Sequence, residues 1–229
     1  GTVSSGSLTM EEQRTERRLA AILAADVAGY SRLMNLDEEG TLQRLKGHLG
    51  ELIEPHIAAH RGRIVKRTGD GLLVDFASAV EAVRCAVAIQ AGMNDRNRGA
   101  PDEARIEFRI GINLGDVIIE GDDVYGDGVN IAARIKGMAQ VGEALVSGSV
   151  HDQIRAKPEF ACESLGGRQF KNISDLVQVW RVVEASEGFP RPPPLRRRRP
   201  TQGKPSDPSP CCRSTICRAI RSRSFSPTA

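Results

Sequence analysis

The sequence predicts an α+β fold, a ferredoxin-like βαββαβ sandwich with further strands appended to it. Three strand patterns support this prediction: a nearly unbroken apolar run at residues 19–27, a hairpin pattern at residues 63–76, and an alternating apolar pattern at residues 106–112. Segments whose apolar residues recur at helical spacing separate them, which gives the order β-α-β-β-α-β.

The first half of this order begins with the run LAAILAADV over residues 19–27, which is typical of a strand buried on both faces. A helix is expected next, and Pro55 disturbs its pattern. The apolar residues that define the helix are Leu42, Leu45, Leu49, Leu52 and Ile53.

The second half begins with a hairpin, because residues 63–68 and 72–76 flank the turn Gly69-Asp70-Gly71. Residues 78–81 form a capping box that opens a helix. The alternation at residues 106–112 predicts a strand with one buried face. A helix over residues 128–138, capped by Asp127, and short strands at residues 144–147 and 177–183 complete the prediction.

The 229 residues fit one domain with extensions. We expect a flexible leader over residues 1–17, one folded domain over residues 18–186, and a disordered tail rich in Pro and Arg over residues 187–229. Residues 188–229 carry a charge balance of +9, and the preceding residues carry −6. The mildly acidic domain gives no sign of a nucleic-acid partner.

No apolar run approaches the length of a transmembrane helix, and the N-terminus lacks the order of a signal peptide. We therefore expect a cytoplasmic protein with no membrane segment in this chain. The five cysteines are spaced irregularly, which favours reduced thiols over a disulfide framework or a zinc site.

Asp26 interrupts the apolar strand where burial is expected to be greatest. A buried carboxylate costs several kcal/mol unless it is paired, protonated or bound to a metal ion. The segment Ala28-Gly29-Tyr30-Ser31 follows and leads into a helix, where backbone N–H groups suit a phosphate chain. The alternative is that Asp26 only caps that helix.

Asp70 lies in the hairpin turn, where most aspartates have a structural role. A sheet can, however, bring this turn beside the end of the first strand. Asp26 and Asp70 could then share two Mg²⁺ or Mn²⁺ ions, which prefer oxygen ligands and often complete their shells with phosphate.

Asn130 and Arg134 are four residues apart and project from one helical face, where they would suit the stabilisation of charge on a reacting phosphate. The alternative is a solvated surface pair. His56 and His60 have a spacing that metal-binding helices use, but no third ligand is evident, so two exposed histidines are expected.

Four stretches occur in a familiar order: ILAADVAGYSRLM, GRIVKRTGDGLLVDF, FRIGINLGDVI and DDVYGDGVNIAARI. Together they resemble the class III adenylate/guanylate cyclase catalytic domain from about Arg18 to about Val183, most closely its bacterial members with a short arm before DDVYGD. No one stretch is specific, whereas their joint occurrence is.

The resemblance implies roles by position. Asp26, Asp70 and the carbonyl of Val27 match the ligands of two divalent cations, Mg²⁺ or Mn²⁺. Lys66 and Asp123 match the pair that reads the purine, although the neighbouring Asp122 leaves that assignment open by one residue. The residues that match contacts to ribose, reacting phosphate and triphosphate are Asn130, Arg134 and Lys171.

Adenine presents an acceptor at N1 and an amino donor at N6, which a lysine and an aspartate complement. Guanine presents the opposite pattern, so we expect ATP as substrate. The implied reaction is metal-assisted in-line attack of the ribose 3′-hydroxyl on the α-phosphate, which yields cyclic AMP and pyrophosphate. The alternatives are a guanylate cyclase and a catalytically silent nucleotide-binding regulatory module.

The resemblance also implies a homodimer whose two sites are shared between subunits. Two departures matter. The arm between Gly115 and Gly126 is short, which bears on the strength of the dimer. Lys136 stands where relatives commonly have an acidic residue, and we expect it to affect the helix end rather than the chemistry.

Overall fold

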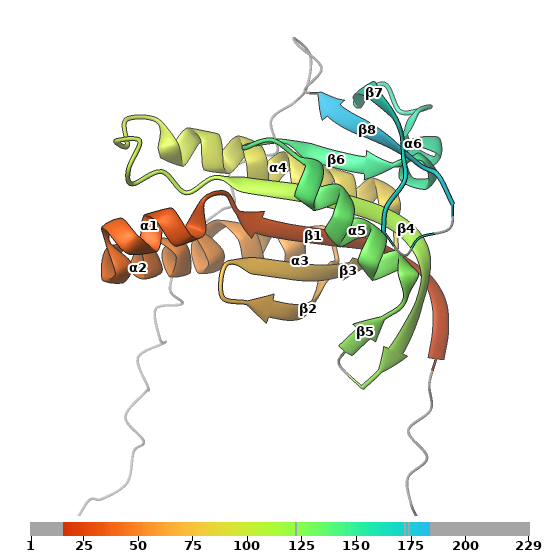
Figure 1. Ribbon diagram of the computed structural model, residues 1–229, viewed down its shortest axis with the longest axis horizontal. Coiled ribbons are helices and arrows are strands. Elements are labelled where there is room, and N and C mark those ends of the chain that lie inside the picture. Colours follow the sequence, from red (N-terminus) through yellow and green to blue (C-terminus); the bar gives the residue numbers. More distant parts are fainter. Residues whose placement is uncertain (1–15, 122, 172, 174, 184–229) are drawn as a thin grey trace, which may run out of the picture. The chain divides into compact units, whose positions relative to one another are not determined.

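One mixed β-sheet forms the centre of the fold (Figure 1). The computed structural model describes residues 16–121, 123–171, 173 and 175–183. The strands are β1 (Glu16–Val27), β2 (Arg63–Thr68), β3 (Gly71–Phe76), β4 (Phe108–Glu120), β5 (Asp123–Tyr125), β6 (Ala144–Ser147), β7 (Ala161–Arg168) and β8 (Val177–Val183). The helices are α1 (Tyr30–Leu36), α2 (Glu38–His48), the π-helix η1 (Leu49–Ile53), α3 (Glu54–Ala59), α4 (Ala79–Asn97), α5 (Asp127–Met138) and α6 (Gly148–Ile154).

The order of the strands confirms the predicted fold class. Strands β2, β3, β1 and β4 lie side by side, and each pair of neighbours is antiparallel, as in a ferredoxin-like sheet. The sheet then extends through β6, β8 and β7, with β6 parallel to β4. The short strand β5 folds back on the end of β4. The predicted core and the appended strands at residues 144–147 and 177–183 are therefore confirmed.

β1 is the central strand and is buried on both faces, as its sequence predicts. Ala21, Leu23 and Ala25 belong to one hydrophobic cluster, which also contains residues of α1–α4 and α6. Ile22 and Ala24 belong to a second cluster on the opposite face, together with Ala132 of α5. Alternation along one strand thus divides the molecule into a thick helical layer and a face that α5 crosses (Figure 1).

The disturbance predicted at Pro55 takes the form of the π-helix η1 directly before it, and Pro55 lies in the first turn of α3. One expectation about local structure is wrong. The strand at Ile110 and Ile112 is not buried on one face only. Gly111 and Asn113, which alternate with these isoleucines and face the other side of β4, are also buried because α5 covers that side.

Half of the predicted capping box is present. Ser78 Oγ accepts a hydrogen bond from the backbone N–H of Glu81 at 3.5 Å, whereas the Glu81 carboxylate contacts His60 and Arg84. Within the described residues, Cys85 and Cys162 are free thiols, and burial raises the pKa of Cys85 to about 12. The other three cysteines, the leader up to residue 15 and the tail lie outside the described residues. None of the helices in the described part of the chain is long and apolar enough to cross a membrane.

Candidate active site

The two predicted metal-binding aspartates come from neighbouring strand ends. β1 pairs with β3 so that Asp26 lies opposite Gly71, and the N–H of Val27 donates to the carbonyl of Asp70 at 3.0 Å. A Cβ at Gly71 would lie 2.9 Å from the carbonyl oxygen of Ala25, so glycine permits this close pairing. The structure therefore brings Asp26, Val27 and Asp70 to one corner of the sheet.

The Asp26 carboxylate is paired with two cations of its own chain. Arg109, opposite it on β4, donates from Nε to Oδ1 and from Nη2 to Oδ2, each at 3.0 Å. Nζ of Lys136, in the last turn of α5, lies 3.0 Å from Oδ2. The side chain of Asp26 is 13% exposed, and these contacts offset the cost of its burial.

These contacts correct the sequence argument in two ways. A buried Asp26 does not by itself require a metal ion, because the chain supplies its counter-charges. Lys136 does reach the predicted chemistry and is not confined to the helix end. The capping alternative is also wrong, since the N-cap of α1 is Gly29, whose φ of 66° lies in the left-handed region that favours glycine.

The oxygen ligands at this corner fit divalent cations whose remaining coordination positions are filled by a substrate. Two carboxylates and a carbonyl supply hard oxygen ligands, and Asp70 is only partly buried. No group of three or more His, Cys, Asp or Glu side chains that could hold a metal occurs in the described part of the chain. Such a site resembles those in which phosphates complete the coordination shell rather than a closed protein cage.

The segment Ala28–Ser31 matches its expectation only in part. The N–H of Ala28 donates to the carbonyl of Glu107 at 2.8 Å, so it is not available to a phosphate. Helix α1 begins at Tyr30, and the first N–H groups of a helix have no partner within the helix. Anion contacts at this segment are thus restricted to residues after Ala28.

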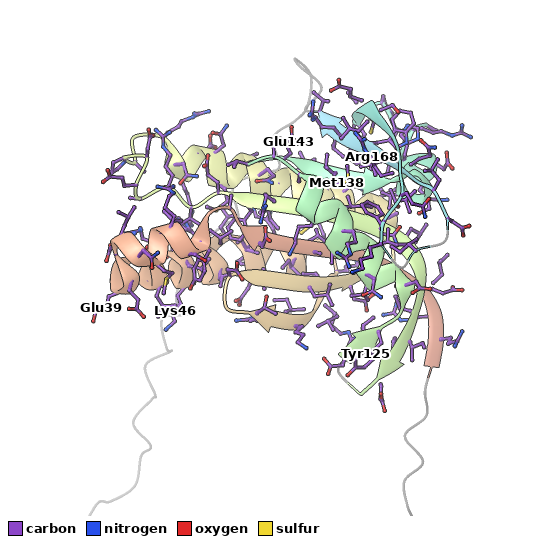
Figure 2. The ribbon with its side chains drawn as sticks, viewed as in Figure 1. Glu39, Lys46, Tyr125, Met138, Glu143 and Arg168 are labelled. Carbon is purple, nitrogen blue, oxygen red and sulfur yellow. The ribbon has the colours of Figure 1, made fainter. Side chains whose placement is uncertain are left out.

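Lys66 and Asp123, the predicted purine pair, lie on β2 and β5, which contact each other. Lys66 is exposed and Asp123 partly exposed. The hydroxyl of Tyr125 donates to Asp123 Oδ2 at 3.1 Å, which raises the pKa of Tyr125 above its ordinary value. Figure 2 labels Tyr125 on this short strand. Sequence reasoning missed this contact, although the i, i+2 spacing on a strand places both residues on one face.

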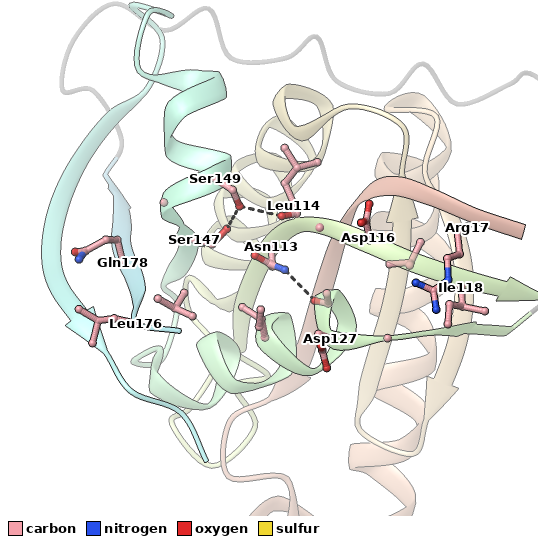
Figure 3. A pocket seen from close by; sticks show the side chains of 17 residues that line it. Arg17, Asn113, Leu114, Asp116, Ile118, Asp127, Ser147, Ser149, Leu176 and Gln178 are labelled. Atoms are coloured by element: carbon pink, nitrogen blue, oxygen red, sulfur yellow. Dashed lines mark hydrogen bonds between the residues drawn. The ribbon is translucent and has the colours of Figure 1, made fainter. Parts of the chain in front are cut away.

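Asn130, Arg134 and Lys171 line one small pocket of about 140 Å³ together with Ile173. Neither Asp26 nor Asp70 lines it. Helix α5 is held above β4 by the hydrogen bond from Asn113 Nδ2 to the carbonyl of Gly128 at 3.1 Å (Figure 3). The N-cap of α5 is Gly126 and makes no side-chain cap, so the expectation that Asp127 caps this helix is wrong.

A larger pocket of about 660 Å³ lies at the other end of β4, between the start of α5 and the start of α6 (Figure 3). Asn113, Asp116, Asp127, Ser149 and Gln178 contribute polar groups to its lining. None of the predicted site residues lines it. Its size therefore does not identify it as the site of the predicted chemistry.

The two histidines are not the exposed pair that the sequence predicts. Both are partly buried, and His60 Nδ1 lies 2.8 Å from Oε2 of Glu81 on α4. Burial lowers the pKa of His56 below its ordinary value. The contact of His60 links α3 to α4 and serves the fold rather than a metal site.

Comparisons with known proteins identify the family. The model of the adenylate and guanylate cyclase catalytic domain matches residues 12–180. The chain is 42% identical over 200 residues to putative adenylate cyclase 3 of Rhizobium meliloti, which covers 87% of this chain but only 34% of that protein. The chain thus spans about a third of the length of that relative.

Solved structures give the same family. An adenylate/guanylate cyclase/hydrolase from Silicibacter pomeroyi is 46% identical, with a TM-score of 0.70 over 74% of this chain and 99% of that one. The guanylyl cyclase Cya2 is 26% identical, with a TM-score of 0.65 over 77% of this chain and 97% of that one. This chain therefore belongs to the family of adenylate and guanylate cyclase catalytic domains.

Proposed function

We propose that this chain is an adenylate cyclase that converts ATP into cyclic AMP and pyrophosphate. The observation that carries the proposal is the pairing of β1 with β3, which places Asp26 and Asp70 at one corner of the sheet. A relative named as a putative adenylate cyclase, at 42% identity, supports the choice within the family. The reaction belongs in the cytoplasm, where ATP is made.

Asp26, Asp70 and the carbonyl of Val27 would hold two divalent cations, Mg²⁺ or Mn²⁺. When bound, these cations would lower the pKa of the ribose 3′-hydroxyl and offset the charge of the departing pyrophosphate. A cation that binds Asp26 would compete with Arg109 and Lys136 for this carboxylate, most strongly at Oδ2, which contacts both of them.

The remaining residues bind and orient the nucleotide. Lys66 donates to N1 of adenine and Asp123 accepts from the N6 amino group, with Tyr125 fixing the second carboxylate oxygen. Asn130 orients the ribose. Arg134 meets the charge that develops on the α-phosphate as the 3′-oxygen attacks, and Lys171 contacts the triphosphate.

The site would be completed by a second copy of the chain. Asn130, Arg134 and Lys171 line one small pocket that includes neither aspartate, and this supports a site divided between two subunits. In a two-fold homodimer, the aspartates of each subunit would face the Asn130 pocket of the other subunit, which gives two equivalent sites.

The test is a product assay on the full chain with Mn²⁺, comparing ATP and GTP. We expect cyclic AMP from ATP, with kcat/KM for GTP at least about a hundredfold lower because guanine mismatches both Lys66 and Asp123. Asp26→Ala should abolish the product. The chain is also similar to a guanylyl cyclase, so a preference for GTP would identify a guanylate cyclase. A folded protein that makes neither cyclic nucleotide would contradict the proposal.

A further inference from the structure

Lys136 is the least expected group at the predicted metal corner. Its ammonium lies 3.0 Å from Oδ2 of Asp26, and that same carboxylate already accepts two hydrogen bonds from Arg109. Lys136 is 23% exposed, so the contact is shielded from solvent more than an ordinary surface ion pair is. One carboxylate therefore faces two cations of its own chain.

The formal charges of the four residues named at this corner sum to zero. Asp26 and Asp70 contribute two negative charges, and Arg109 and Lys136 contribute two positive ones. A divalent cation that approaches Asp26 alone meets a carboxylate whose charge is already neutralised. It also meets an ammonium that must move away, since like charges at such distances repel strongly where water is partly excluded.

Of the two protein cations, Lys136 is the one that can leave. The guanidinium of Arg109 makes two parallel hydrogen bonds to the carboxylate, which fixes its geometry. Lys136 makes a single contact through a compact ammonium on a flexible four-carbon stem.

Lys136 also acts separately from the Asn130 pocket. It follows Arg134 by two residues, so their side chains leave α5 about 200° apart at 100° per residue. Arg134 lies in the pocket with Lys171, whereas Lys136 turns to β1. A substitution at Lys136 therefore changes the carboxylate corner and leaves the other half-site in place.

We propose that Lys136 is a positioning residue, an internal counter-ion that holds Asp26 before substrate arrives and makes the entry of the divalent cation depend on the nucleotide. A triphosphate brings the negative charge that the neutral corner lacks, so cation and nucleotide bind together while Lys136 withdraws. This inference rests on the proposed function, because it assigns Asp26 as a metal ligand.

The experiment measures Mn²⁺ binding to the full chain by the electron paramagnetic resonance signal of free Mn²⁺, without nucleotide and with a non-hydrolysable ATP analogue. Lys136→Met and Lys136→Gln remove the charge at similar length, and Lys136→Arg keeps it. Lys46→Met is the matched control, since Lys46 projects from α2 into solvent (Figure 2).

Without nucleotide, we expect Lys136→Met and Lys136→Gln to bind Mn²⁺ about tenfold more tightly than the wild type, because a repelling charge has been removed. Lys136→Arg and Lys46→Met should match the wild type. With the analogue bound, the difference should shrink. In turnover, the charge-removing variants should need less free Mn²⁺ for half-maximal rate, with KM for ATP little changed.

Equal Mn²⁺ affinities for the wild type and both charge-removing variants would overturn the role of Lys136, as would a difference that persists unchanged with the analogue. A wild-type protein that makes no cyclic nucleotide would instead overturn the proposed function. The binding and product assays thus separate the two failures.

Discussion

At the scale of single residues, the sequence predicts the position of Asp26 but not its partners. An acid inside an apolar strand was a reliable sign of a special position, and the pairing with β3 confirms its place beside Asp70. Its partners could not be predicted, because Arg109 follows 83 residues later and only the register of β1 on β4 brings them together. The charge of Asp26 is consequently compensated within the protein.

We predict that the preference for ATP over GTP depends on Lys66. Lys66→Met should lower the preference for ATP over GTP at least about tenfold, because the donor to adenine N1 is lost. Arg67→Met is the matched control, since Arg67 pairs with Glu54 at 2.9 Å instead. The measurement is kcat/KM for both nucleotides, and an unchanged ratio in Lys66→Met would argue against its place in the purine site.

Asp75 is predicted to matter for stability alone. Its side chain is 3% exposed and is ion-paired with Arg18 and with Arg63. Asp75→Ala should lower the free energy of unfolding by about 2 kcal/mol, because it removes a buried carboxylate that pairs with two partly exposed arginines. Asp95→Ala, which removes the exposed pair with Arg98, should change it by less than about 1 kcal/mol. Urea unfolding compares them, and equal losses would refute the distinction.

At the scale of elements, long regular patterns were predictable and short irregular ones were not. The strand at residues 19–27 was predicted because apolar residues dominate it, and the hairpin because a Gly-Asp-Gly turn separates its two strands. β5 has three residues, too few for a pattern. No residue of β7 is buried and its register shifts between Ser164 and Gly166, so its sequence shows no alternation.

The packing of α5 on β4 positions more of the proposed site residues than any other contact between elements, because α5 carries Asn130, Arg134 and Lys136. A Cβ at Gly111 would lie 2.2 Å from the backbone nitrogen of Lys136 and 2.6 Å from the carbonyl oxygen of Ala132. The helix that carries Arg134 and Lys136 thus rests directly on this glycine.

Gly111→Ala should therefore push α5 away from the sheet, lower the free energy of unfolding by about 3 kcal/mol and reduce kcat strongly. Gly137→Ala is the control on the same helix. It meets no heavy atom within 4 Å and should be neutral or stabilising by about 0.5–1 kcal/mol. Thermal unfolding and turnover of the two variants measure the difference, and a Gly111→Ala protein as stable as the wild type would refute the close approach.

At the scale of the whole molecule, the residues of the proposed nucleotide site fall into two groups. The aspartates lie where β1 meets β3, and Asn130 and Arg134 lie in the pocket with Lys171. The resemblance to class III cyclases already implied that the two groups come from different subunits, and the fold adds the pocket that Asn130 and Arg134 share with Lys171. The proposed dimer rests on that resemblance and is supported by this grouping.

Intersubunit complementation tests that claim most directly. Asp26→Ala and Asn130→Ala should each be nearly inactive alone, and a mixture of the two should recover activity up to about a quarter of the wild-type rate, since half of the dimers are mixed and each holds one intact site. Mixed dimers, verified by differential tagging, that recover no activity would contradict a site built from two copies of this chain.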